Sequence, residues 1–176
     1  MSGHTDFMND VADILERFRR GGELLAMSTT GAAGSELDFK PAPDKWSVRQ
    51  IVCHLSDSEA VAVMRIRQIA AEDNPTLQAF NGELWADHLD YQRRKISQAL
   101  ETFRKLRSEN HELLKALPED VFSRSGNHTE SGRLTLLDLV KGNAEHVEEH
   151  VQQIQRTRAA YKEHRAKQAA QAPAQQ

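Results

Sequence analysis

Cysteine is almost absent from this chain, and long apolar runs are absent too. Among 176 residues there is a single cysteine, Cys53, so an internal disulfide is excluded. No run of about 20 apolar residues occurs; even residues 60–71 are interrupted by Arg65, Arg67 and Gln68, so a membrane-spanning helix is not expected. The N-terminus lacks the basic start and continuous apolar stretch of a secretory signal, and we therefore expect a cytoplasmic protein.

A surplus of positive charge is also missing. The chain has 23 Lys and Arg against 26 Asp and Glu, which gives a formal net charge of −3 at pH 7. A sequence-independent nucleic-acid binder needs a basic surplus, so neither nucleic acid nor a membrane is expected as a partner. A chain of 176 residues has the length of one domain, and it can bury enough surface to fold without a structural metal. Any bound metal would therefore have a functional role.

The hydrophobic periodicity is helical, and strand-like alternation bounded by turns does not occur. Apolar residues recur every three or four positions in residues 5–27, 47–71, 91–117 and 135–160. Ser47 and Gln50 form an S-x-x-Q capping box at the start of the second helix, and Thr135 with Asp138 forms a T-x-x-D cap for the fourth. These patterns predict an all-α four-helix bundle in a single domain of residues 1–166, with either an up-and-down or a crossover topology.

The connections between the predicted helices are long. Loops are predicted at residues 28–45, 73–90 and 123–132. Phe80 and Trp85 lie in the second of these loops, and we expect them either in a pocket wall or in the core. Residues 167–176 consist mostly of Ala and Gln and lack apolar anchors, which predicts a disordered tail.

Two histidines in the fourth predicted helix have the spacing of a metal site. His146 and His150 lie four residues apart, so their imidazoles lie on one face of the helix about one turn apart and can share a metal ion. His54 lies at the margin of the apolar stripe of the second helix. Three neutral imidazoles and one open position form the ligand set of a catalytic divalent metal, and zinc and nickel both accept imidazole. The alternative is three surface histidines bonded to nearby carboxylates.

Other chemical patterns in the sequence are weaker. Residues 146–150 also match the H-x-x-E-H pattern of zinc peptidases with Glu149 as general base, but the chain that follows is too short for such a domain. Cys53 adjoins His54, yet neighbouring helical residues point about 100° apart, so we expect a buried structural thiol. Asp57 lies one turn after His54 and is expected either to orient that imidazole or to be solvated. No residue is assigned a catalytic or cofactor-binding role beyond metal ligation.

A longer stretch of the sequence resembles a known family. Residues 45–58, KWSVRQIVCHLSDS, resemble the second-helix signature of the DinB superfamily, particularly of its YfiT-like branch of metal-dependent hydrolases. The resemblance continues through residues 72–76 and Trp85 to residues 132–139. It covers residues 41–154, which is most of the chain, and its combined motifs are far more specific than any one of them.

The resemblance implies a metal site with three defined ligands. In this family three histidines bind a divalent metal inside a four-helix bundle, and His54, His146 and His150 are the matching positions in this chain. Members of the branch often carry further histidines at the position of Cys53 and near Glu59, so this chain departs from the family pattern there.

The resemblance also implies an enzyme. Its metal would lower the pKa of a bound water or low-molecular-weight thiol and present that group to a small electrophilic substrate. Hydrolase and thiol S-transferase activities need the same three imidazoles, so both stay open. The implied cofactors are a divalent transition metal, zinc or nickel, and a low-molecular-weight thiol; a homodimer is expected as well. The alternatives are a non-catalytic stress-response or binding module of the DinB fold, and a helical assembly protein with incidental histidines.

Overall fold

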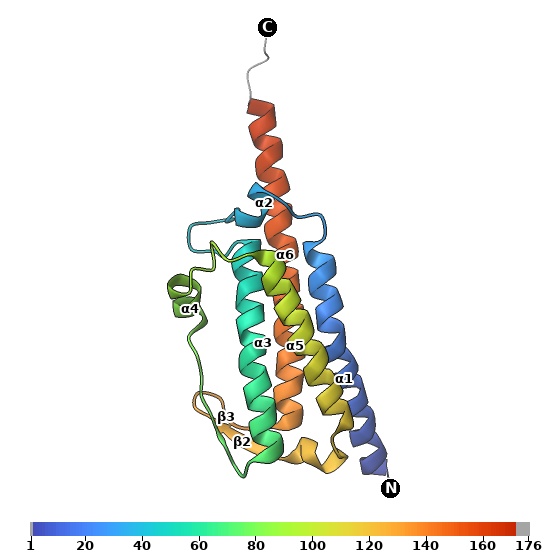
Figure 1. Ribbon diagram of the computed structural model, residues 1–176. Coiled ribbons are helices and arrows are strands. Elements are labelled where there is room, and N and C mark those ends of the chain that lie inside the picture. Colours follow the sequence, from blue (N-terminus) through green and yellow to red (C-terminus); the bar gives the residue numbers. More distant parts are fainter. Residues whose placement is uncertain (1, 172–176) are drawn as a thin grey trace.

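Each of the four periodic segments forms a long helix in the computed structural model, which describes residues 2–171 (Figure 1). The long helices are α1 (Ser2–Thr29), α3 (Val48–Ala71), α5 (Ile96–Ala116) and α6 (Leu136–Gln171). The connections contain the short elements α2 (Ser35–Asp38), β1 (Thr76–Leu77), α4 (Gly82–His88), η1 (Glu119–Ser123), β2 (Ser125–His128) and β3 (Gly132–Thr135). The predicted all-α four-helix bundle is confirmed.

The bundle has a crossover topology. Helices α3 and α5 both begin at the end that carries α2 and end near the strands, so they run parallel, whereas α1 and α6 run in the opposite direction (Figure 1). The connection at residues 72–95, here called the crossover segment, contains β1 and α4 and leads the chain back along α3 before α5 begins. Helices α1 and α3 each pack against both α5 and α6. The sequence left this topology open, because connections of that length serve either arrangement.

Both helix starts that the sequence predicts are confirmed by reciprocal hydrogen bonds. The Ser47 hydroxyl accepts from the Gln50 amide at 3.3 Å, and Gln50 Oε1 accepts from the Ser47 amide at 3.1 Å. The Thr135 hydroxyl accepts from the Asp138 amide at 3.0 Å, and Asp138 Oδ2 accepts from the Thr135 amide at 3.0 Å. Such boxes satisfy backbone donors that a helix end leaves free. They fix where α3 and α6 begin, and hence which side chains these helices turn inward.

The interior contains two apolar clusters at successive levels of the bundle. The level nearer α2 is filled by residues that include Leu25, Ile51, Leu55, Phe103, Val151 and Ile154. The level nearer the strands is filled by residues that include Phe18, Ile66, Ile69, Leu114, Leu136 and Val140. Burial of these apolar surfaces supplies the main driving force for folding.

A buried polar network lies between the two levels. Arg107 Nη2 on α5 donates to Glu59 Oε2 on α3 at 2.6 Å, and Asn110 Nδ2 donates to Glu59 Oε1 at 3.1 Å. Arg107 Nη1 donates to the Phe18 carbonyl of α1 at 2.9 Å, so the guanidinium connects three helices. A Cβ at Gly21 would lie 2.9 Å from Arg107 Nη1, which explains why α1 has a glycine at this position.

The prediction of a loop without strands at residues 123–132 is wrong, because this segment contains β2 and the start of β3. β2 pairs antiparallel with β3, with Gly126 opposite Leu134, and β1 pairs parallel with β2, with Thr76 opposite Asn127. These strands are short, and β2 consists of Ser, Gly, Asn and His. A period of two cannot be recognised in such segments, because strand propensity depends on branched and aromatic side chains.

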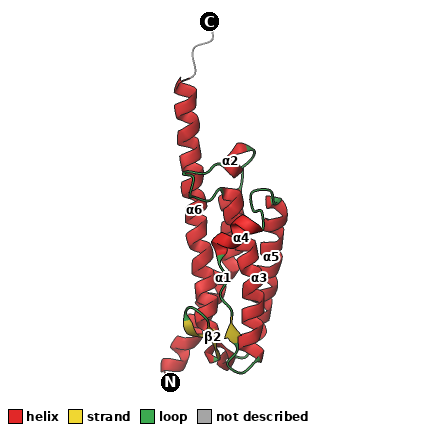
Figure 2. Cartoon of the chain, turned by 90° about the vertical axis from the view of Figure 1, so that its left-hand side faces the viewer, coloured by secondary structure: helices red, strands yellow, loops and turns green. Residues whose placement is uncertain are grey.

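The last helix is longer than the sequence predicts. α6 extends to Gln171, so residues 167–171 of the expected disordered tail are helical with exposed side chains, and residues 172–176 lie outside the described residues. The distal part of α6 projects beyond the other helices (Figures 1 and 2). Where it leaves the bundle, Arg158 donates to Glu36 Oε1 at 2.7 Å and to the Ser28 carbonyl at 2.6 Å. Within residues 2–171, no helix has the length and apolar character needed to cross a membrane.

Candidate metal centre

The three histidines predicted from the sequence come together between α3 and α6. His54 Nε2 lies 3.1 Å from His146 Nε2, and His150 Nε2 lies 3.0 Å from His146 Nε2. One nitrogen from each imidazole lies within 4.8 Å of the other two. His54 is buried, and the two histidines of α6 are half-buried. The spacing of four residues on α6 therefore places two imidazoles toward the same point that His54 reaches from α3.

These imidazoles are neutral at physiological pH. Burial, together with the neighbouring His146 and His150, lowers the pKa of His54 to about 3. Burial also lowers the pKa of His146 to about 4 and lowers the pKa of His150. A neutral imidazole keeps a lone pair for a metal ion, so burial favours the form that ligation requires.

Gln153 determines which nitrogen of His150 faces the centre. His150 Nδ1 lies 2.7 Å from Gln153 Oε1. An amide oxygen can only accept, so Nδ1 donates the hydrogen and the lone pair of Nε2 is directed at the other two histidines. Outer hydrogen bonds of this kind orient imidazole ligands in metal sites. The sequence analysis missed Gln153, although its position three residues after His150 on a helix is a usable signal.

The geometry of the three nitrogens fits a divalent ion. Ligands at about 2.0–2.1 Å in a tetrahedral site are separated by roughly 3.3 Å. The observed contacts of His146 Nε2 to its two neighbours, 3.1 and 3.0 Å, are close to that value. His54 Nδ1 is buried and has no hydrogen-bond partner among the described residues. Three facing imidazole nitrogens have too few hydrogens to satisfy one another, whereas a cation satisfies all three at once.

Aromatic side chains enclose the histidines. The ring of Trp46 lies 4.8 Å from the ring of His54 and stacks on that of His150 at 6.2 Å and 15°. The ring of Phe80 lies 6.3 Å from that of His54 and 4.6 Å from that of Trp85. The crossover segment therefore supplies part of the wall of the site. The contacts of Trp46 with His150 and of Phe80 with His54 join residues that are distant in sequence, so no local pattern predicts them.

The backbone of Gly82, at the start of α4, lies directly against the imidazole of His54. A Cβ at this position would lie 3.1 Å from His54 Cε1 and 3.3 Å from His54 Nδ1. A side chain would therefore press on the imidazole, and glycine allows α4 to cover it. The Asn81-Gly82 pair marks a turn in the sequence, but it does not indicate a contact with His54.

Asp57 and Cys53 lie near His54 in the sequence, but their side chains form contacts that stabilise the fold and do not contribute to the metal centre. Asp57 accepts from Tyr91 Oη at 2.7 Å and from Arg94 Nη1 at 2.8 Å, so it neither orients His54 nor is fully solvated. Cys53 is fully buried, its thiol donates to the Tyr91 carbonyl at 3.8 Å, and burial raises its pKa to about 11. The prediction of a buried structural thiol is confirmed.

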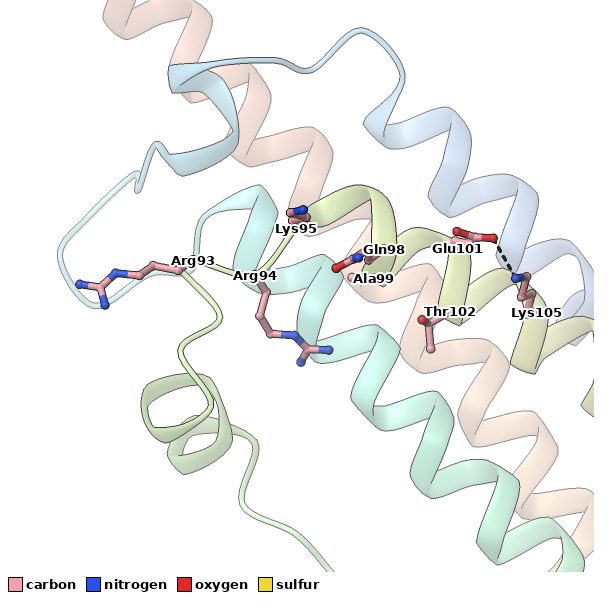
Figure 3. A pocket seen from close by; sticks show the side chains of 8 residues that line it. All are labelled: Arg93, Arg94, Lys95, Gln98, Ala99, Glu101, Thr102 and Lys105. Atoms are coloured by element: carbon pink, nitrogen blue, oxygen red, sulfur yellow. Dashed lines mark ion pairs between the residues drawn. The ribbon is translucent and has the colours of Figure 1, made fainter.

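A separate polar hollow lies at the start of α5 (Figure 3). It has a volume of about 570 Å³ and is lined by Arg93, Arg94, Lys95, Gln98, Ala99, Glu101, Thr102 and Lys105. Its Lys105 pairs with Glu101 at 2.8 Å, and its Arg94 pairs with Asp57. None of the three candidate ligands lines this hollow, so it is not part of the metal centre.

Comparison with known proteins identifies the family. The family model of the DinB superfamily matches residues 17–154, a range that contains all three histidines, the whole of α3 and the first part of α6. The chain belongs to the DinB superfamily. The resemblance described from the second-helix signature is therefore confirmed over most of the chain.

Several relatives carry names that refer to metal-dependent hydrolysis. A protein of Oceanobacillus iheyensis, named "Putative metal-dependent hydrolase", is 26% identical over 149 residues, which cover 85% of this chain and 82% of that protein. YfiT of Bacillus subtilis, which carries the same description, is 26% identical over 108 residues, 61% of each chain. The solved structure of YfiT superposes with a TM-score of 0.78 at 22% identity, covering 84% of this chain and 85% of that one. The two chains share a fold, described for YfiT as an unusual four-helix bundle topology.

Proposed function

We propose that this protein is a metal-dependent hydrolase whose divalent metal is held by His54, His146 and His150. The observation that carries this proposal is the convergence of three neutral imidazole nitrogens between α3 and α6. The names of its relatives support the same class of reaction. When bound by three imidazoles, a divalent ion acts as a Lewis acid and lowers the pKa of a small nucleophile at its open position.

The protein's own residues prepare the centre for this role. Gln153 holds the His150 imidazole in the tautomer with Nε2 available. Trp46 and Phe80 cover His54 and keep water away from much of its ring. Ser58 Oγ lies 3.4 Å from His54 Nε2, where its hydroxyl is available to orient a nucleophile or substrate. A partly dry site strengthens electrostatic interactions with the reacting group.

Hydrolysis of an activated ester tests the proposal. The full chain is freed of metal, then loaded with zinc or nickel, and the release of p-nitrophenol from p-nitrophenyl acetate is followed. Loading should stimulate hydrolysis in the wild type, and His146→Ala should show only the rate of the metal-free protein. His88→Ala is the control, because His88 is exposed on α4 and lies outside the cluster. Equal rates with and without metal, or an undiminished rate in His146→Ala, would contradict the proposal.

The same samples separate hydrolysis from the other functions that the sequence leaves open. They are assayed with a small electrophile in the presence and absence of a low-molecular-weight thiol. Metal-dependent turnover that requires the thiol would replace hydrolysis by thiol S-transfer. A correctly loaded protein that turns over neither the ester nor the electrophile would favour the non-catalytic module.

A further inference from the structure

An apolar groove adjoins the metal centre on the outer face of α3. It has a volume of about 700 Å³, within the range of about 300–1,000 Å³ that is usual for small-molecule sites. Ala60, Val61 and Met64 of α3 form its floor, and Phe80 and Trp85 of the crossover segment form its opposite wall. Met64 is 63% exposed, which is unusual for so large an apolar side chain beside two aromatic rings.

Phe80 connects this groove to the histidines. Its ring lines the groove and also lies 6.3 Å from the ring of His54. Val61 of the groove floor lies seven residues after His54, two turns along the same face of α3. A molecule lying in the groove with one end past Phe80 would therefore reach the edge of the three-histidine cluster.

The groove contains the positive charge of Arg65, which forms no ion pair with a carboxylate of residues 2–171. Arg65 lines the groove, is half-buried, and its guanidinium carbon lies 5.9 Å from the centre of the Phe80 ring. It donates through Nη2 to the Gln78 carbonyl at 2.6 Å, while its Nε is buried without a hydrogen-bond partner. The nearest carboxylate influence on Arg65 within the described residues is a longer-range attraction to Glu130.

The acidic residue of the groove does not neutralise this charge. Asp57 also lines the groove, but its carboxylate accepts hydrogen bonds from Tyr91 and Arg94. The groove therefore offers a large apolar and aromatic surface together with one guanidinium that has no ion-pair partner among the described residues. A ligand complementary to it has an apolar body and an anionic group, because a half-buried guanidinium forms its strongest hydrogen bonds with carboxylate or phosphate.

We propose that this groove binds the apolar body of the substrate and that Arg65 pairs with a carboxylate on it, which makes the substrate class a small amphipathic carboxylic acid. This inference rests on the proposed function, because the groove serves the reaction only if the three histidines hold a metal. Its binding step, however, can be measured without turnover.

Calorimetric titration with a matched pair of probes tests the groove. The full chain, as purified and after metal removal, is titrated with 4-phenylbutyrate and with its uncharged amide. The carboxylate should bind at least about tenfold more tightly than the amide, the usual gain from a charge-assisted hydrogen bond, in both forms of the protein. Binding to the metal-free form excludes direct coordination of the carboxylate to a metal.

Two variants and two controls assign the binding to the groove. Arg65→Gln should weaken the carboxylate about tenfold and leave the amide unchanged. Ala60→Trp, at an exposed position on the floor, should weaken both probes by filling the groove. Arg104→Gln and Ala12→Trp change exposed residues outside the groove and should bind both probes as the wild type does.

Equal binding of the two probes, a carboxylate affinity unchanged in Arg65→Gln, or no binding at all would overturn the inference. If no probe binds, the molar mass in solution is measured. A wild type with the mass of two chains and an Ala60→Trp variant with the mass of one would show that the groove contacts a second copy of the chain. The metal content of every sample is measured in parallel. Stoichiometric metal without probe binding would contradict only the groove, and probe binding to a protein that takes up no metal would contradict only the proposed hydrolase.

Discussion

Single residues around the three histidines decide how accurately the imidazoles are held. His54 has no hydrogen-bond partner at Nδ1 among the described residues, so on that side its ring is held by packing rather than by a polar contact. Trp46 covers one side of the ring, and the backbone of Gly82 lies against its edge. His150, by contrast, is fixed by the hydrogen bond to Gln153. The position of His54 is therefore the more sensitive of the two to small changes in shape.

Replacement of Gly82 by alanine tests this sensitivity. The new methyl group would lie 3.1 Å from His54 Cε1, so the imidazole has to move by a few tenths of an ångström. We expect the affinity for zinc to fall roughly 10- to 100-fold, as for other changes in the surroundings of metal ligands. Competition with a chromogenic chelator measures this affinity. Gly22→Ala is the control, because a Cβ there meets nothing within 4 Å; equal affinities of the two variants would contradict the account.

Three long helices are joined at one level by the buried pair of Glu59 and Arg107. Both side chains are almost completely buried, with exposures of 1% and 3%. The guanidinium also lies 3.9 Å from the centre of the Phe18 ring and 4.9 Å from that of Phe103. A buried ion pair adds little net stability, but removal of one partner leaves an uncompensated charge in the interior.

The effects of replacing Glu59 and Arg107 on the free energy of unfolding should therefore be strongly non-additive. Glu59→Met should lower the free energy of unfolding by about 3–5 kcal/mol, because Arg107 stays buried without its carboxylate. The double variant with Arg107→Met should recover most of that loss, since methionine fills similar volume without charge. Urea unfolding of the metal-free proteins measures both effects. A double variant at least as unstable as Glu59→Met would show that the pair itself stabilises the bundle.

At the scale of the whole molecule, the helices could be predicted from the sequence, whereas the crossover could not. The four apolar stripes and the capping residues Ser47 and Thr135 are local signals, and each long helix follows from them. The strands at 125–135 were missed, because they are held by pairing between segments rather than by their own composition. The course of the crossover depends on contacts made by Phe80 and Trp85, which periodicity does not encode.

Only part of the candidate site could be predicted, because local patterns in the sequence do not show contacts between separate helices. His146 and His150 could be paired from helical spacing alone, but spacing cannot bring His54 from another helix to the same point. The margin of the apolar stripe makes His54 a third candidate, the family resemblance matches it as a ligand by motif position, and the structure brings the three together. Three properties stay predictions from the sequence: that the protein forms a homodimer, that its metal is zinc or nickel, and that it is cytoplasmic.

The most direct test of the central claim is the metal content of the untagged protein, measured by elemental analysis after reconstitution with zinc or nickel and removal of excess ion. We predict close to one metal ion per chain in the wild type and in the His88→Ala control. We predict loss of that ion in His54→Ala, His146→Ala and His150→Ala, because each removes one of three converging nitrogens. A wild type that holds no metal, or histidine variants that keep a full equivalent, would contradict the three-histidine centre.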